Sequence, residues 1–156
     1  TSLLASFIFV SCVNKQKENN IKFSIDYIGG GYDGLMLKNQ LKMHLNNFNL
    51  LDANSKLQIQ ADVSHSSDLF ITNIDNTSDR ERIDSSIQFK VYDIEFECYT
   101  YLYKDSFSQF YVLASSEKFT SNKTAVEEIK IENLDYFIKV FINNLDESVL
   151  ICNEEK

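Results

Sequence analysis

The chain has 156 residues, of which 44% are hydrophobic and 13% aromatic, and its formal net charge is −8. This length suits one domain and excludes a multidomain enzyme or a large barrel, while the apolar content excludes a disordered protein. The acidic balance, 23 Asp and Glu against 15 Lys and Arg, argues against a nucleic-acid binder, since nothing concentrates positive charge against phosphates.

The first twelve residues predict a lipoprotein signal. Leu3–Val10 is an apolar run, too short to span a bilayer as a helix but typical of a signal-peptide core. It ends in Phe9-Val10-Ser11-Cys12, which resembles a bacterial lipobox. We therefore expect residues 1–11 to be a signal peptide truncated at its start, Cys12 to be the lipidated residue carrying palmitate-type chains, and 12–20 to be a polar tether. The alternative for the apolar run is a core strand.

A strand and a helix are expected next. The alternation of apolar and polar residues over 22–28 predicts a half-buried strand. All four glycines lie in 29–34 and predict a turn, with Asp33 as the N-cap of the helix that follows. That helix is indicated by apolar residues at spacings of four, four and three: Leu37, Leu41, Leu45 and Phe48.

A run of strands follows this helix. Residues 57–63 alternate and predict a strand, after which the polar segment 64–79 is either a long loop or a strand that extends away from the sheet. Further strands are predicted over 83–91, over 96–102 and from 110–114 toward Phe119.

A long amphipathic helix closes the chain, starting near Ser121 or Thr124. The order β-α-β-β-β-β-α predicts one α+β domain over 21–156. We expect a two-layer sandwich, in which two helices pack on one face of a mostly antiparallel sheet of four to five strands.

Patterns that could carry chemistry have simpler explanations. Gly29-x-Gly31-x-x-Gly34 satisfies a dinucleotide fingerprint, but only one β-α-β unit could form, so a turn is favoured. Neither His44 nor His65 has a partner at metal-ligand spacing. Residues 64–68 include Ser, His and Asp, but sequence neighbours cannot adopt triad geometry, and a solvated loop is favoured. We expect no catalytic residue, no metal and no cofactor.

Two cysteines remain if Cys12 is lipidated. Cys98 lies on a predicted strand and Cys152 in the C-terminal tail. Their spacing in the sequence does not distinguish a disulfide between them from two separate thiols, because a disulfide depends on the distance and orientation of the two cysteines in the fold.

Tyrosines line one predicted strand. Tyr99, Tyr101 and Tyr103 alternate with residues expected to face the helices, which places the three rings on the other side of the sheet. Such a stripe is either a partner-binding surface or a consequence of β-propensity.

The order of these segments resembles the lipopolysaccharide-assembly lipoprotein family LptE. The resemblance rests on 37–42 and 50–52 in and after the first helix, on the 57–63 strand, on 104–107, and on 111–115 before the last helix. It implies a non-enzymatic outer-membrane lipoprotein, lipid-anchored at the periplasmic face, that plugs the LptD β-barrel and assists lipopolysaccharide transport. A Val, not an Asp, follows Cys12, which also favours the outer membrane.

The resemblance also implies basic residues that meet lipid phosphates, but the segment 68–79 is acidic and polar where the family has a basic loop. Charge and loop placement single out other candidates: Arg80, Arg82, Lys104, Lys118 and Lys123. Two other functions remain open, an auxiliary lipoprotein of an ABC-type lipid transporter and a small periplasmic enzyme.

Overall fold

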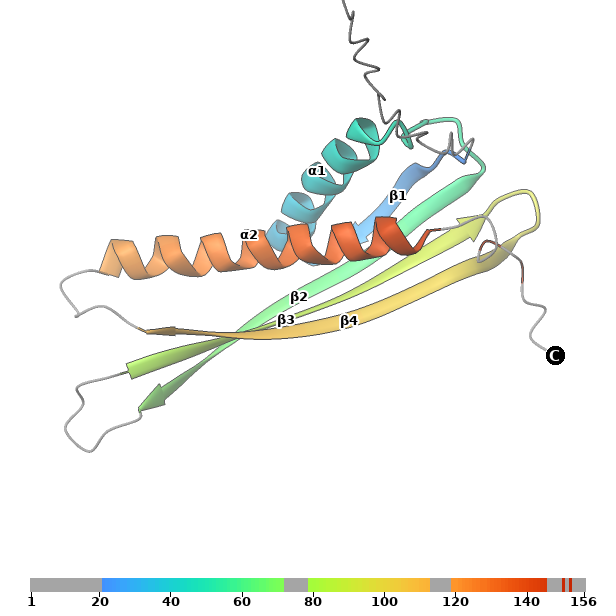
Figure 1. Ribbon diagram of the computed structural model, residues 1–156. Helices are drawn as coiled ribbons and strands as arrows, with labels where there is room; N and C mark the ends of the chain where they lie inside the picture. Colours follow the sequence, from blue (N-terminus) through green and yellow to red (C-terminus); the bar gives the residue numbers. More distant parts are fainter. Residues whose placement is uncertain (1–20, 72–78, 113–118, 146–149, 151, 153–156) are drawn as a thin grey trace, which may run out of the picture.

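The computed structural model describes residues 21–71, 79–112, 119–145, 150 and 152. Six elements follow one another (Figure 1): β1 (Ser24–Gly29), α1 (Gly31–Asn47), β2 (Leu57–Ile71), β3 (Asp79–Asp93), β4 (Cys98–Val112) and α2 (Phe119–Asn144). The predictions for the signal peptide, for Cys12 and the tether, and for Lys118 lie outside the described residues.

The four strands form one sheet in the order β1-β2-β3-β4. β1 pairs with β2 in parallel, as expected for strands joined through a helix, and the other two pairings are antiparallel. Both helices lie on one side of this sheet, with α1 against β1 and β2 and α2 against β3 and β4 (Figure 1). The predicted two-layer α+β class is confirmed.

Three of the strands are longer than the sequence pattern indicated. β2 continues to Ile71, so the polar segment that begins at Ser64 is a strand in its described part and not a loop. The strands predicted over 96–102 and 110–114 are one strand, β4. β2 and β3 stay paired over the whole of their length, from Leu57↔Asp93 to Ile71↔Asp79. Strands of 15 residues are about 50 Å long.

The core lies between the sheet and the helices. α1 buries Leu37, Leu41 and Leu45 against the sheet, as their spacing predicted. Phe48, the fourth residue of the predicted stripe, is instead the C-cap of α1 and is exposed. Phe89 of β3 is fully buried, and its ring stacks on that of Phe141 from α2, with centroids 4.2 Å apart. Each fully buried Leu or Phe stabilises the fold by about 1.5–3 kcal/mol.

The turn between β1 and α1 depends on glycine. Gly30, and not the predicted Asp33, is the N-cap of α1, and its φ of 111° lies in the region that favours glycine. A Cβ on Gly30 would lie 2.5 Å from the carbonyl oxygen of Val63 on β2. A Cβ on Gly34 would meet the carbonyl oxygen of Gly29 at the same distance. Close packing of α1 onto the sheet therefore accounts for Gly30 and Gly34, of which only Gly34 belongs to the fingerprint pattern.

Candidate functional site

The helix-free face of β2, β3 and β4 is the surface that the fold leaves open, and we refer to it as the outer face. Cross-strand register places Ser64, Ser86 and Ser106 side by side at its centre. The hydroxyls of Ser64 and Ser86 lie 2.8 Å apart. Asp62, Gln88 and Lys104 line the same shallow depression. The centre of the outer face is therefore polar and built from small side chains.

Exposed apolar side chains flank this polar centre. Toward the β3–β4 turn, Tyr99 and Leu102 are 52% and 55% exposed. Toward the other end of β4, Phe110 and Val112 are 61% and 57% exposed. A polar centre between two apolar ends is a composition suited to contact with another macromolecule, because aromatic and aliphatic anchors supply contact area there.

A β-bulge in β4 corrects the predicted tyrosine stripe. Tyr99 pairs with Tyr92, but Tyr101 pairs with the preceding residue, Val91, so Thr100 is an extra residue in β4. The hydroxyl of Thr100 donates to the carbonyl oxygen of Val91 at 3.3 Å. Strict alternation would keep the three tyrosines on one face, and the bulge separates Tyr99 from the other two.

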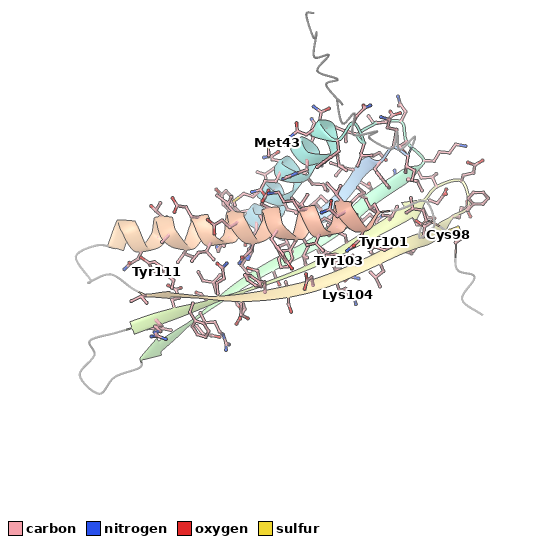
Figure 2. The ribbon with its side chains drawn as sticks, in the orientation of Figure 1. Met43, Cys98, Tyr101, Tyr103, Lys104 and Tyr111 are labelled. Atoms are coloured by element: carbon pink, nitrogen blue, oxygen red, sulfur yellow. A yellow bond between two sulfur atoms is a disulfide. The ribbon has the colours of Figure 1, made fainter. Side chains whose placement is uncertain are left out.

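Tyr101 and Tyr103 face the helices, so their predicted placement on the helix-free side is wrong. Their ring centroids lie 6.0 and 6.3 Å from that of Phe141 on α2 (Figure 2). Burial raises the pKa of both phenols, and Tyr103 also donates to Asp105 Oδ2 at 2.7 Å, which raises its pKa further. Leu102, which was expected to face the helices, lies on the outer face instead.

Tyr99 alone of the three lies on the outer face. Its ring contacts that of Tyr92 at 5.1 Å, and Lys90 Nζ lies 5.6 Å from its centroid. Its hydroxyl donates to Gln60 Oε1 at 3.3 Å. These neighbours hold the ring in place while half of it stays accessible, so the partner-binding prediction now depends on Tyr99.

The structure separates the predicted phosphate contacts. Arg80, which is exposed, pairs with Val112, while Lys104 pairs with Gln88, so Arg80 and Lys104 lie eight residues apart along the sheet, about 27 Å. Arg82 already forms ion pairs with Asp68 at 3.0 Å and Asp84 at 2.9 Å.

Lys123 lies on α2, on the opposite side of the sheet from Arg80 and Lys104. The described candidates therefore do not converge on one anion site. Each remains a separate prediction.

A buried polar cluster joins α2 to the sheet, and the sequence reasoning missed it. His65 Nδ1 lies 2.7 Å from Ser85 Oγ, to which Asn133 Nδ2 donates at 2.8 Å. Ser85 and Asn133 are each 1% exposed. The histidine was assigned to a solvated loop, whereas β2 points it toward the helices. The one signal in the sequence was an Asn beside the apolar stripe of α2.

Burial lowers the pKa of His65, and three charged side chains act on it. Asp33 and Glu127 oppose the shift and Lys130 adds to it. The Ser85 hydroxyl is inaccessible to a substrate, so the cluster is suited to fixing α2 on the sheet and not to nucleophilic catalysis.

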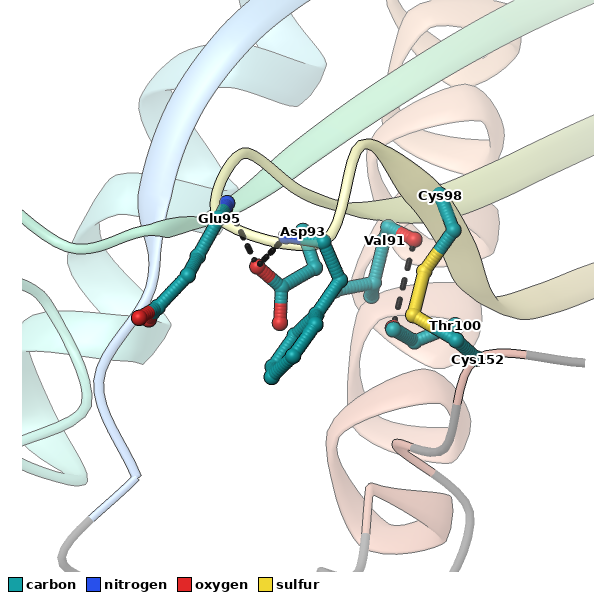
Figure 3. Close-up of a disulfide and its surroundings, with 7 residues drawn as sticks. Val91, Asp93, Glu95, Cys98, Thr100 and Cys152 are labelled. Atoms are coloured by element: carbon teal, nitrogen blue, oxygen red, sulfur yellow. Dashed lines mark hydrogen bonds between the residues drawn. A yellow bond between two sulfur atoms is a disulfide. The ribbon is translucent and has the colours of Figure 1, made fainter.

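The disulfide left open by the sequence is present. Cys98, at the start of β4, is bonded to Cys152, with a Cα–Cα distance of 5.9 Å (Figure 3). It ties the C-terminal tail to the sheet near the β3–β4 turn, where Asp93 Oδ1 accepts from the backbone N–H of Glu95.

Two further observations bound the possible sites. Among the residues that the structure describes, no group of three His, Cys, Asp or Glu side chains could hold a metal ion. Within the same residues, neither helix is both long enough and apolar enough to cross a bilayer.

The architecture is that of a small two-layer α+β protein, and solved structures of other proteins share it. Rare lipoprotein B from Shewanella oneidensis is similar in structure, with a TM-score of 0.57 and 12% identity over 78% of this chain and 94% of that one. A minor lipoprotein from Acinetobacter baumannii has a TM-score of 0.58 and 14% identity over 85% and 96%. No protein-family model matches, and no curated protein matches in sequence.

Proposed function

We propose that this protein is an outer-membrane lipoprotein of the LptE type, which plugs an LptD-type β-barrel and assists lipopolysaccharide transport to the cell surface. Cys12 carries the lipid anchor at the periplasmic face. Rare lipoprotein B is another name for LptE, so the fold similarity agrees with the resemblance of the sequence.

The observation that carries the proposal is the outer face itself. Strands about 50 Å long expose Tyr99 and Leu102 near one end and Val112 near the other, with polar side chains between them. The lumen of a large barrel is lined with polar side chains, so a plug needs a long contact surface that is mostly polar, with a few apolar anchors.

Co-purification from detergent-solubilised outer membranes tests this role. The wild-type chain is expected to capture a β-barrel of LptD size, and a Leu102→Asp and Val112→Asp double variant to lose most of it. Ile131→Asp is the control for an acidic substitution away from the outer face, because Ile131 is 43% exposed but lies on α2. Equal capture by the outer-face variant would remove the plug assignment, and capture of inner-membrane ABC transporter subunits would favour the alternative role.

Membrane fractionation tests the anchor separately. A Cys12→Ser variant is expected to move from the membrane fraction to the soluble fraction, because the thiol that receives the acyl chain is gone. A variant that stays fully membrane-bound would contradict lipidation at Cys12.

A further inference from the structure

The exposed side of α1 differs from the rest of this acidic chain. Tyr32, Leu35 and Met43 are 70%, 56% and 53% exposed, and Met43 lies on the side of α1 away from the sheet (Figure 2). Their spacings of three and eight residues place them along one stripe, opposite the buried leucines. Asn39 and Asn46 lie in the same stripe.

The charges on α1 point to the chemistry of its partner. Lys38 and Lys42 are exposed beside the stripe. The only carboxylate in α1, Asp33, is half-buried and lies 3.9 Å from Lys130 of α2. A chain with a net charge of −8 therefore presents one helix side whose exposed charges are all positive. Apolar and basic side chains on one helix side match an anionic lipid surface.

The point at which the tether joins the domain fixes the orientation. Phe23 donates its backbone N–H to the carbonyl oxygen of Leu50 at 2.7 Å, just past the end of α1, and Lys22 Nζ donates to the carbonyl oxygen of Asn49. The described chain therefore begins beside the C-terminal end of α1. Eight residues, 13–20, separate Cys12 from Ile21 at the start of the domain, and the nine residue steps between the two span at most about 32 Å.

We infer that α1 docks its exposed side onto the anionic surface of the membrane that holds the lipid anchor. This inference depends on the anchor part of the proposed function and not on the barrel. α1 itself is about 25 Å long, so the whole helix lies within reach of the headgroups. Because a short tether gives a local concentration in the millimolar range, an intrinsically weak contact is sufficient.

Oxidation of Met43 by hydrogen peroxide, followed by mass spectrometry, measures this contact. The lipidated full-length protein is reconstituted in vesicles of phosphatidylethanolamine with one quarter phosphatidylglycerol. Unlipidated Cys12→Ser protein gives the rate for the free helix. We expect Met43 to oxidise at least threefold more slowly in the vesicles, and the protection to weaken at high salt because the charges are screened.

Charge variants separate docking from simple anchoring. Lys38→Glu with Lys42→Glu is expected to co-sediment with the vesicles but to oxidise at the free rate. Lys90→Glu with Lys139→Glu, on β3 and α2, makes the same change in net charge and is expected to keep the protection.

Three outcomes would overturn the inference. Wild-type protein that co-sediments but oxidises at the free rate would remove docking and leave the anchor intact. Wild-type protein that does not co-sediment would remove both. Protection that persists in the Lys38 and Lys42 variant would remove the charge contact with the lipid surface, and protection without vesicles would assign the α1 surface to a second copy of the chain.

Discussion

The bulge at Thr100 leads to a test of which side of the sheet each tyrosine occupies. Tyr101→Ser removes a half-buried ring that packs toward Phe141, whereas Tyr99→Ser removes a ring that is 52% exposed on the outer face. Half of a Tyr side chain is roughly 100 Å², worth about 2.5 kcal/mol of burial, and the ring contacts add about 0.5–1.5 kcal/mol. We therefore expect Tyr101→Ser to lower the free energy of unfolding by about 3–4 kcal/mol. We expect Tyr99→Ser to lower it by about 2–3 kcal/mol, because the buried half of that ring packs on Tyr92.

Urea unfolding followed by far-UV circular dichroism measures both values. A double-mutant cycle with Phe141→Leu adds a test that does not depend on burial. Tyr101 and Phe141 are expected to couple by about 0.5–1.5 kcal/mol, and Tyr99 and Phe141 to show no coupling, since they lie on opposite sides of the sheet. Coupling between Tyr99 and Phe141, or no coupling between Tyr101 and Phe141, would refute the bulge as the cause of their separation.

Three further predictions concern stability. Burial lowers the pKa of His65 below 6.5, so as the pH falls the unfolded chain binds a proton at this histidine before the folded chain does. The free energy of unfolding should therefore decrease below about pH 6.5, by up to about 1.4 kcal/mol per pH unit. A pH titration of the His65→Gln variant should lack this decrease. The Cys98–Cys152 disulfide closes a loop of 54 residues, and its reduction should lower the free energy of unfolding by up to about 4 kcal/mol. Equal free energies of unfolding with and without reductant would contradict this. Gly30→Ala should cost more than about 1 kcal/mol in urea unfolding and more than Gly31→Ala, because only at Gly30 does a Cβ meet the neighbouring strand.

The periodicity of apolar residues was sufficient to predict the two layers of the fold. The spacing of Leu37, Leu41 and Leu45 identified the buried stripe of α1, and alternation over 57–63 identified the part of β2 that faces the core. These signals arise from burial, which repeats with the period of the element. The fold class was predictable for that reason.

The extent of the long strands was not predictable in the same way. From Ser64 to Asp68 β2 is polar on both sides, because α1 covers only the first half of the strand and the outer face is open. A strand that buries few side chains shows no alternation of apolar residues, so its sequence cannot be distinguished from that of a loop. His65 was misassigned for this reason.

The candidate site was predicted only in part. Tyr99 was identified, but the faces of Tyr101 and Leu102 depend on one extra residue, Thr100, and a bulge reverses the side of every residue beyond it. Sequence alternation cannot reveal that shift when Thr, Tyr and Leu are all acceptable in a strand. The exposed stripe of α1 was not predictable, because Tyr, Leu and Met are the same residue types that fill a buried core.

Photocrosslinking in intact cells tests the central claim, contact between the outer face and a β-barrel, most directly. A benzophenone amino acid is placed at Leu102 on the outer face or at Ile131 on α2, both of which are exposed. We predict a crosslink from position 102 to an outer-membrane barrel protein and a much weaker one from position 131. A strong crosslink from position 131 with none from position 102 would contradict it.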